Sequence, residues 1–190
     1  VLAGKRADLS VRRKMQVVFQ DPYSSFNPRH KVARLISEPF HLLDRSAGER
    51  DVEEALISVG LAPTDKHKYI HEFSGGQRQR IAIARALIIK PELIILDEAV
   101  SALDVSIRAQ ILDLLAELSE QFGLTYLFIS HDLSVVQSIT DRVLVMKAGK
   151  IVEHGETDQV FNHPRHPYTQ SLIAAAPTLP QLVEECTADL

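Results

Sequence analysis

The sequence predicts an α/β protein in which a parallel β-sheet is flanked by helices. Two observations carry this prediction. In the second half of the chain, short apolar segments alternate with amphipathic segments, which is the order of strands and helices in a parallel sheet. One apolar segment, residues 93–96 (Leu-Ile-Ile-Leu), is an unbroken aliphatic run typical of a strand buried on both faces.

The first half of the chain predicts one strand followed by helices. Residues 15–19 are a short apolar run, and the prolines, serines and asparagine of residues 20–29 mark a loop. A helical pattern follows. Residues 46–49 (Ser-Ala-Gly-Glu) are a candidate capping box for a helix that Gly60 would end.

The second half predicts the alternating elements of the sheet. Ser74 begins a helix that Pro91 ends. The elements that follow are a strand at 93–96, a helix at 106–122 ended by Gly123, a strand at 124–129, a helix at 133–139, and strands at 143–146 and 151–152.

Composition narrows the class of protein. A chain of 190 residues is long enough for one good core, and its net charge of −4 argues against a nucleic-acid partner. The single cysteine, Cys186, permits no internal disulfide, which fits a reducing compartment. No apolar run approaches the roughly 18 residues that span a bilayer, and no signal peptide is visible. The first residue is Val1 and not Met, which is consistent with a truncated or processed start.

Two acids follow the predicted buried strand directly. Asp97 and Glu98 would be costly to desolvate there unless something positive lay beside them. A Mg²⁺ ion with nucleotide phosphates would meet that need. Asp97 would then hold the metal, and Glu98 would orient and deprotonate an attacking water. For the segment in isolation, acids that merely cap the next turn are an equally good interpretation.

Two further polar residues follow predicted strands. Gln20 lies at a loop entrance, where a neutral amide can contact a metal or water. His131 would emerge at the same sheet edge as Asp97 and could donate to a γ-phosphate. Taken alone, a plain loop glutamine and a histidine that begins a helix with Asp132 are the simpler interpretations.

The segment Ser74-Gly75-Gly76 predicts an anion site at a helix start. The serine satisfies orphan N–H groups, the glycines expose others, and the helix dipole adds partial positive charge. An N-cap that needs no ligand is the simpler interpretation of these three residues alone.

Together, and in this order, these motifs resemble the nucleotide-binding domain of ATP-binding cassette (ABC) proteins. The matches are Gln20 for the Q-loop, Ser74–Gln77 for the signature motif, Leu93–Asp97 for Walker B, Glu98 for the catalytic carboxylate, Ser101–Asp104 for the D-loop and His131 for the switch histidine. The resemblance implies a P-loop NTPase-type sheet with an α-helical signature subdomain.

The resemblance also implies roles, cofactors and partners. Glu98 and His131 would be catalytic, Asp97 and Gln20 would hold Mg²⁺, and ATP would be contacted by Gln20, Ser74, Gly75, Gly76, Gln77 and Asp104. Two such ATPase subunits, identical or different, would pair head to tail, each signature motif contacting the other subunit's ATP. Transmembrane permease subunits would be the other partners, at the cytoplasmic face of the membrane.

Finer features resemble the ATPases of dipeptide and oligopeptide importers, a subfamily shared with glutathione and nickel importers. These are "FQDPYSSFNPR" (19–29), "LDVSIRAQILDLL" (103–115) and the tail "HPRHPYTQSLIAAAP" (163–177). His163 and His166 in this tail could be interpreted as metal ligands. The sequence favours the interpretation that they belong to an ordinary family tail.

The departures from the family pattern are specific. Ala99 and Val100 replace the usual Pro-Thr, which is expected to weaken rigidity without loss of chemistry, and Phe73 replaces a leucine. No G-x-x-x-x-G-K-[ST] loop is found, and the resemblance places that loop before Val1. The chain alone is therefore expected to bind ATP poorly and not to turn it over. Its sheet should also carry an exposed apolar edge.

Four parts are expected: 1–30, the end of an N-terminal core portion with the Q-loop; 31–90, the helical signature subdomain; 91–158, a RecA-like core; and 159–190, the importer-type tail. The expected function is the ATP-hydrolysing subunit of an importer for peptides or similar small solutes. The alternative is a degenerate half-site that donates its signature motif to a partner ATPase. A soluble cassette ATPase of translation or repair is less favoured.

Overall fold

The computed structural model describes residues 9–21 and 24–176, in two compact units. The first unit ends at Asp132 and the second begins at Leu133. The predictions for Cys186 and for the two ends of the chain lie outside the described residues. The division into four parts stays a prediction.

The described helices and strands are α1 (Leu9–Lys14), β1 (Met15–Phe19), α2 (Val32–Ser37), η1 (Glu38–Leu42), α3 (Glu49–Ser58), η2 (Pro63–His67), η3 (Ile70–Glu72), α4 (Gly75–Leu87), β2 (Leu93–Asp97), α5 (Val105–Phe122), β3 (Thr125–Ile129), α6 (Leu133–Ile139), β4 (Arg142–Lys147), β5 (Lys150–Glu156), α7 (Thr157–Asn162) and α8 (Pro167–Ala174). The η elements are short 3₁₀ helices.

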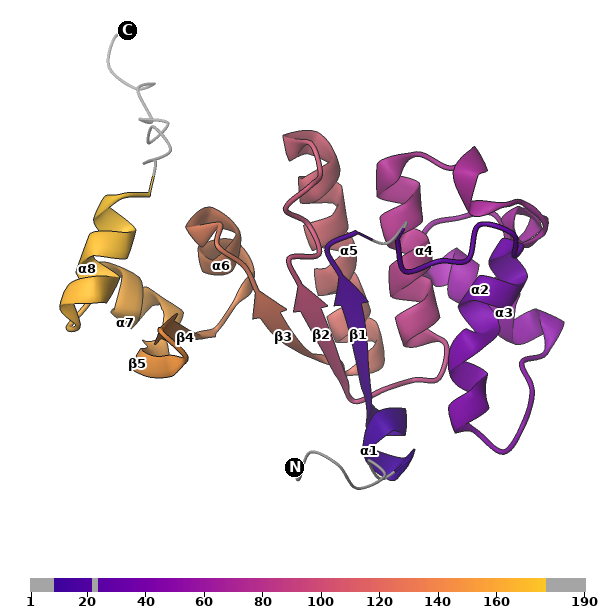
Figure 1. Ribbon diagram of the computed structural model, residues 1–190, viewed down its shortest axis with the longest axis horizontal. Coiled ribbons are helices and arrows are strands. Elements are labelled where there is room, and N and C mark those ends of the chain that lie inside the picture. The colour runs from indigo at the N-terminus through magenta and orange to yellow at the C-terminus, as the bar shows by residue number, and fades with distance from the viewer. Residues whose placement is uncertain (1–8, 22–23, 177–190) are drawn as a thin grey trace, which may run out of the picture. The chain divides into compact units, whose positions relative to one another are not determined.

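The first unit contains a three-stranded parallel sheet in the order β1-β2-β3 (Figure 1). This confirms the predicted α/β class. In its register Phe19 lies beside Asp97, and Asp97 lies beside Ile129. The three strands therefore end at one level, and the residues after them share the carboxyl edge of the sheet.

Burial along β2 alternates. Ile94 and Leu96 are fully buried, whereas Leu93 and Ile95 are only half-buried, because successive side chains point to opposite faces of the sheet. The prediction that both faces are buried is therefore correct for one face only. Leu127 and Ile129 of the edge strand β3 are exposed, and the predicted apolar edge itself stays a prediction.

The chain between β1 and β2 is helical. Helix α4 is its central element, packing against α2, α3, β1 and α5, which explains why residues 81–84 are all buried. The predicted capping box at residues 46–49 is wrong: Gly48 precedes α3, and its N–H donates to the Asp51 carboxylate at 2.7 Å. The Arg45 guanidinium, which donates to the same carboxylate, and this N–H lower the pKa of Asp51 to about 2. Asp51, the third residue of α3, thus accepts the backbone N–H bond that the predicted capping box assigned to Glu49.

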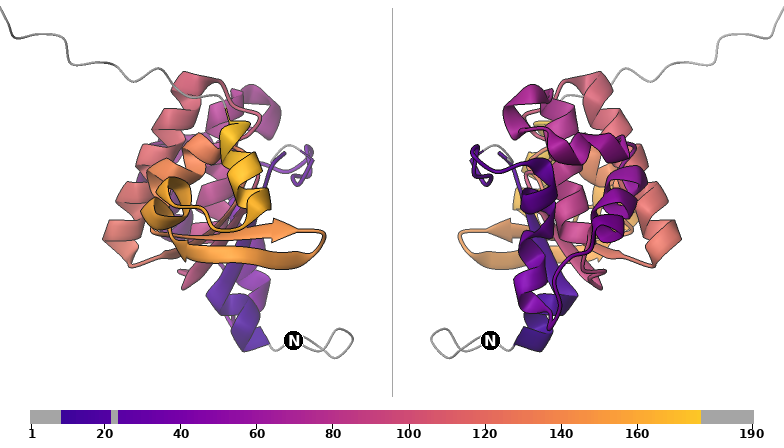
Figure 2. Two further views of the ribbon diagram at one scale, coloured as in Figure 1. Left: turned by 90° about the vertical axis from the view of Figure 1, so that its left-hand side faces the viewer. Right: turned by 90° about the vertical axis from the view of Figure 1, so that its right-hand side faces the viewer.

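The second unit is built on a hairpin. Strands β4 and β5 form a separate antiparallel pair, joined by a two-residue turn at Ala148 and Gly149 (Figure 2). Both turn residues have positive φ (49° and 76°), as tight hairpin turns require. Helix α7 packs on the hairpin, and Lys147 lies 4.5 Å from the centre of the Tyr168 ring of α8.

Among the described residues, no helix combines the length and apolarity needed to cross a membrane.

Candidate functional site

Glu98 is held rigidly where β2 ends. Its backbone adopts a left-handed conformation (φ 53°), which costs a residue with a Cβ about 1–2 kcal/mol. Its N–H donates to the Ile129 carbonyl at 2.9 Å, and its carbonyl accepts from the Ser101 N–H (3.1 Å) and hydroxyl (2.8 Å). These bonds offset the strain and fix the direction in which the carboxylate leaves the sheet.

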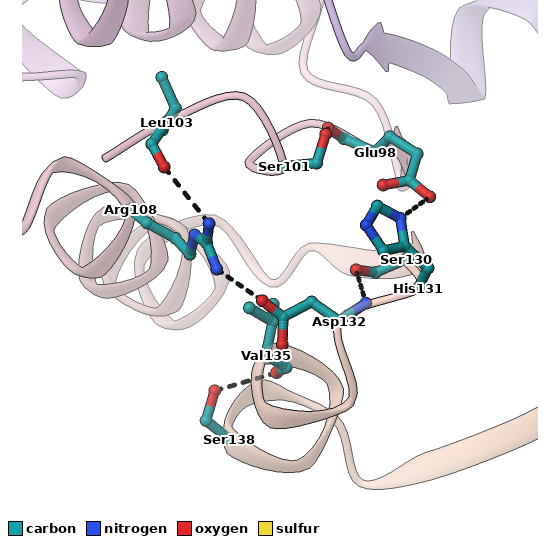
Figure 3. A network of polar contacts seen from close by, with 9 residues as sticks. All are labelled: Glu98, Ser101, Leu103, Arg108, Ser130, His131, Asp132, Val135 and Ser138. Carbon is teal, nitrogen blue, oxygen red and sulfur yellow. Dashed lines mark hydrogen bonds and ion pairs between the residues drawn. The ribbon is translucent and has the colours of Figure 1, made fainter. Parts of the chain in front are cut away.

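The carboxylate of Glu98 contacts the predicted switch histidine. His131 Nδ1 lies 2.8 Å from Glu98 Oε1 (Figure 3). This hydrogen bond raises the pKa of His131 above its ordinary value. The second oxygen, Glu98 Oε2, is buried and has no hydrogen-bond partner in the described part of the chain. A buried carboxylate oxygen without a donor is costly, so Oε2 is suited to contact a ligand or a water.

Asp97 and Gln20 lie at the same edge of the sheet. Asp97 is the last residue of β2, and Gln20 follows Phe19, the register neighbour of Asp97. Neither side chain forms an ion pair or a hydrogen bond with the residues that the structure describes.

The donor set at this edge fits Mg²⁺ bound together with phosphates. The described residues include no group of three or more His, Cys, Asp or Glu side chains able to hold a metal alone. A Mg²⁺ ion needs only one or two protein oxygens when phosphates and water supply the rest of its coordination. The unpaired Asp97 carboxylate and the Gln20 amide oxygen meet that requirement.

The predicted signature segment begins α4. Ser74 is the N-cap: its hydroxyl accepts from the Gln77 N–H (3.4 Å), and the Gln77 side-chain oxygen accepts from the Ser74 N–H (3.0 Å). This is a complete capping box. In the described chain neither residue bonds to Glu98 or His131, which contact each other instead.

The two glycines of the segment have different surroundings. Gly75 is exposed, and a Cβ added to it would meet no atom within 4 Å. A Cβ on Gly76 would lie 2.6 Å from Ile107 Cγ2, well inside the contact limit. Gly76 therefore allows α4 to pack closely on the first turn of α5.

We expect Gly76→Ala to lower the free energy of unfolding of the full-length protein by about 1–3 kcal/mol through overpacking. Removing the opposing methyl with Ile107→Ala should recover part of that loss, so the double variant is less destabilised than the sum of the single variants. Gly75→Ala is the control and should change stability little. Equal losses from the two glycine substitutions, measured by urea unfolding, would contradict this assignment.

The turn after Glu98 is tightly packed despite its departure from the family pattern. Ala99 and Val100 are both 2% exposed, and Ser101 makes the two bonds to Glu98 described above. Asp104 precedes α5, and its carboxylate is exposed and forms no cap bond. Its contact with nucleotide stays a prediction, as does the expectation that the turn preserves the chemistry.

Sequence reasoning missed Arg85. Its guanidinium lies 4.6 Å from the centre of the Phe26 ring and donates to the Ser25 carbonyl (3.2 Å) and hydroxyl (3.1 Å). These contacts tie α4 to the loop that follows Gln20. The available signal was a lone charge in the apolar run of residues 81–89.

Sequence reasoning also missed Arg108. This α5 residue donates to the Asp132 carboxylate at 2.5 Å and to the Leu103 carbonyl at 3.3 Å. Nothing in the spacing of the sequence indicated these contacts.

The tail histidines have structural surroundings. The Glu153 carboxylate accepts from the N–H groups of Arg165 (2.8 Å) and His166 (3.0 Å), which holds the tail on β5. His166 Nδ1 accepts from the Tyr168 N–H (3.1 Å) at the start of α8. These bonds give His166 a structural role, and the interpretation of the two histidines as part of an ordinary tail stays a prediction.

Two family models match the chain. Residues 3–101 match a model described as "ABC transporter". Residues 152–187 match one described as "Oligopeptide/dipeptide transporter, C-terminal region".

Curated relatives and a solved structure are also similar. The chain is 54% identical over 171 residues to the dipeptide transport ATP-binding protein DppF of Escherichia coli K12, covering 88% of the chain and 51% of the relative. It is 54% identical over 180 residues to the oligopeptide transport ATP-binding protein AppF of Bacillus subtilis 168, covering 93% and 54%. The chain thus spans about half the length of these relatives. The structure of cbiO1 from Clostridium perfringens, part of the ABC transporter complex cbiONQ, is similar with a TM-score of 0.71 at 31% identity, covering 82% of this chain and 62% of that one.

Proposed function

Because the chain belongs to the ABC transporter family, we propose that it supplies the Walker B, signature and switch-histidine region of an ATPase subunit that drives import of peptides or similar small solutes. The observation that carries the enzymatic part is the Glu98–His131 contact at the carboxyl edge of a parallel sheet. The match of residues 152–187 to a peptide-transporter region supports the substrate class.

Each side chain at the edge has a task in this proposal. Bound Mg²⁺-ATP supplies the phosphoryl group that is transferred to water. Asp97 and Gln20 hold the metal, and Glu98 orients the attacking water and accepts its proton. The raised pKa of His131 favours the form with hydrogen on both ring nitrogens, so Nε2 donates to the γ-phosphate while Nδ1 stays on Glu98.

The signature segment acts on a different nucleotide. We propose that Ser74, Gly75, Gly76 and Gln77, with Asp104, contact the ATP of a second ATPase subunit, which is consistent with a signature segment that makes no bond to Glu98 or His131 in the described chain. The exposed Gly75 and the positive end of α4 suit a phosphate.

Coupling to the membrane uses the loop after Gln20. Arg85 joins that loop to α4, so movement of the Gln20 segment and of the signature helix is linked. The proposed further partners are transmembrane permease subunits, at the cytoplasmic face of the membrane.

The test is reconstitution of the full-length protein with its permease subunits in lipid vesicles. We expect ATP hydrolysis and ATP-dependent uptake of short peptides. Hydrolysis coupled to uptake of another solute only would refute the substrate class, and a complex that does not hydrolyse ATP would refute the enzymatic assignment.

A further inference from the structure

We propose that Arg108 is a positioning residue: by holding Asp132 it fixes the position of the neighbouring His131. It thereby links the switch histidine to the D-loop (Ser101–Asp104) of the same subunit. The inference rests on the proposed ATPase function, because it assigns Arg108 a part in that same site.

The contacts of Arg108 reach two separate segments. Nη1 donates to Asp132 Oδ2 at 2.5 Å, and Nη2 donates to the Leu103 carbonyl at 3.3 Å (Figure 3). The side chains of the ion pair are only 24% and 28% exposed. A pair shielded to this extent is screened less than a surface pair and holds its geometry better.

The residues on both sides of His131 are fixed. Asp132, which follows it, is held by Arg108, and the Asp132 N–H donates to the hydroxyl of the preceding Ser130 at 3.0 Å. The backbone that carries the imidazole is therefore closed into a turn whose position depends on α5.

The contacts form a circuit that begins and ends at Glu98. The Glu98 carbonyl holds Ser101, and the turn continues to Leu103, whose carbonyl accepts from Arg108. Arg108 then binds Asp132, and the neighbouring His131 returns to the Glu98 carboxylate. A shift of Arg108 would move the imidazole relative to the proposed general base.

Arginine is suited to this position for its shape. Its planar guanidinium donates to the Asp132 carboxylate and the Leu103 carbonyl at the same time, whereas a lysine ammonium is a point charge on a flexible side chain. Arg108 Nε is buried without a partner in the described chain, a cost that argues against stability as its main role. The preceding residue, Ile107, packs on Gly76, so the same turn of α5 also contacts the signature helix.

The test compares kcat and KM for ATP in the full-length ATPase carrying Arg108→Ala, Arg108→Lys, Asp132→Asn and the Arg108→Ala/Asp132→Asn pair. We expect each single variant to lower kcat about tenfold with KM changed less than twofold, since misplacing a catalytic group mainly affects turnover. The kcat of the double variant should be no lower than that of either single variant, because both substitutions remove the same contact. Arg142→Ala, in an exposed ion pair of the second unit, is the matched control and should keep wild-type kcat.

The decisive arm places Arg108→Ala in a His131→Ala background, where it should lower kcat no further. A further tenfold loss there, or full activity of Arg108→Lys, in an active wild-type protein would overturn this inference while leaving the proposed function intact. A wild-type protein without ATPase activity would overturn both.

Discussion

In the full-length protein, Glu98→Gln is expected to lower the kcat of the proposed ATP hydrolysis by about 100-fold or more while ATP still binds. The amide keeps the size and most hydrogen bonds of the carboxylate but cannot accept a proton from water. The main-chain bonds that fix residue 98 do not involve its side chain, so the fold should tolerate the change. The measurement is steady-state phosphate release together with equilibrium ATP binding.

Glu117→Gln, at an exposed position of α5, is the control and should hydrolyse ATP at the wild-type rate. The opposite pattern is also informative. If Glu98→Gln leaves turnover unchanged and Ser74→Ala impairs it, the chain acts as a signature-donating half-site and not as a catalyst.

The second large effect is expected from His131→Ala, which should lower kcat about 100-fold with little change in ATP affinity. The substitution removes the contact to Glu98 and the proposed donor to the γ-phosphate, an interaction that matters most in the transition state. The imidazole is 76% exposed, so its loss should leave the free energy of unfolding nearly unchanged.

Single-turnover hydrolysis and thermal unfolding of the same preparation check the two parts of this prediction. His154→Ala, at an exposed position of β5, is the matched control. A His131→Ala protein that hydrolyses ATP normally would show that the histidine only begins α6, the simpler interpretation of the sequence.

Elements with a clear hydrophobic pattern or a clear stop residue could be predicted from the sequence. The strand at residues 15–19 and the helix at 133–139 have the predicted bounds. Gly123 ends α5 as predicted, and its backbone is left-handed. The common edge of Glu98 and His131 followed from the rule that parallel strands end together.

Contacts set by tertiary packing could not be predicted. Arg85 meets Ser25, and Arg108 meets Asp132, across 60 and 24 positions of sequence, and no local pattern encodes such pairs. The cap at Gly48 was missed because two overlapping pairs could cap this helix, Ser46 with Glu49 and Gly48 with Asp51. Only the folded geometry decides between them. Residues 147–150 do predict a turn, but the alternation of strands and helices predicted one parallel sheet, and the separate antiparallel pair of β4 and β5 was therefore missed.

The most direct measurement is a structure of the full-length protein carrying Glu98→Gln, determined with Mg²⁺-ATP. We expect a γ-phosphate at the carboxyl edge of the β1-β2-β3 sheet, with His131 within hydrogen-bonding distance, Asp97 directed at the metal and the signature segment of a second subunit on the opposite side. Nucleotide bound away from this edge, or a γ-phosphate that neither His131 nor Asp97 approaches, would contradict it.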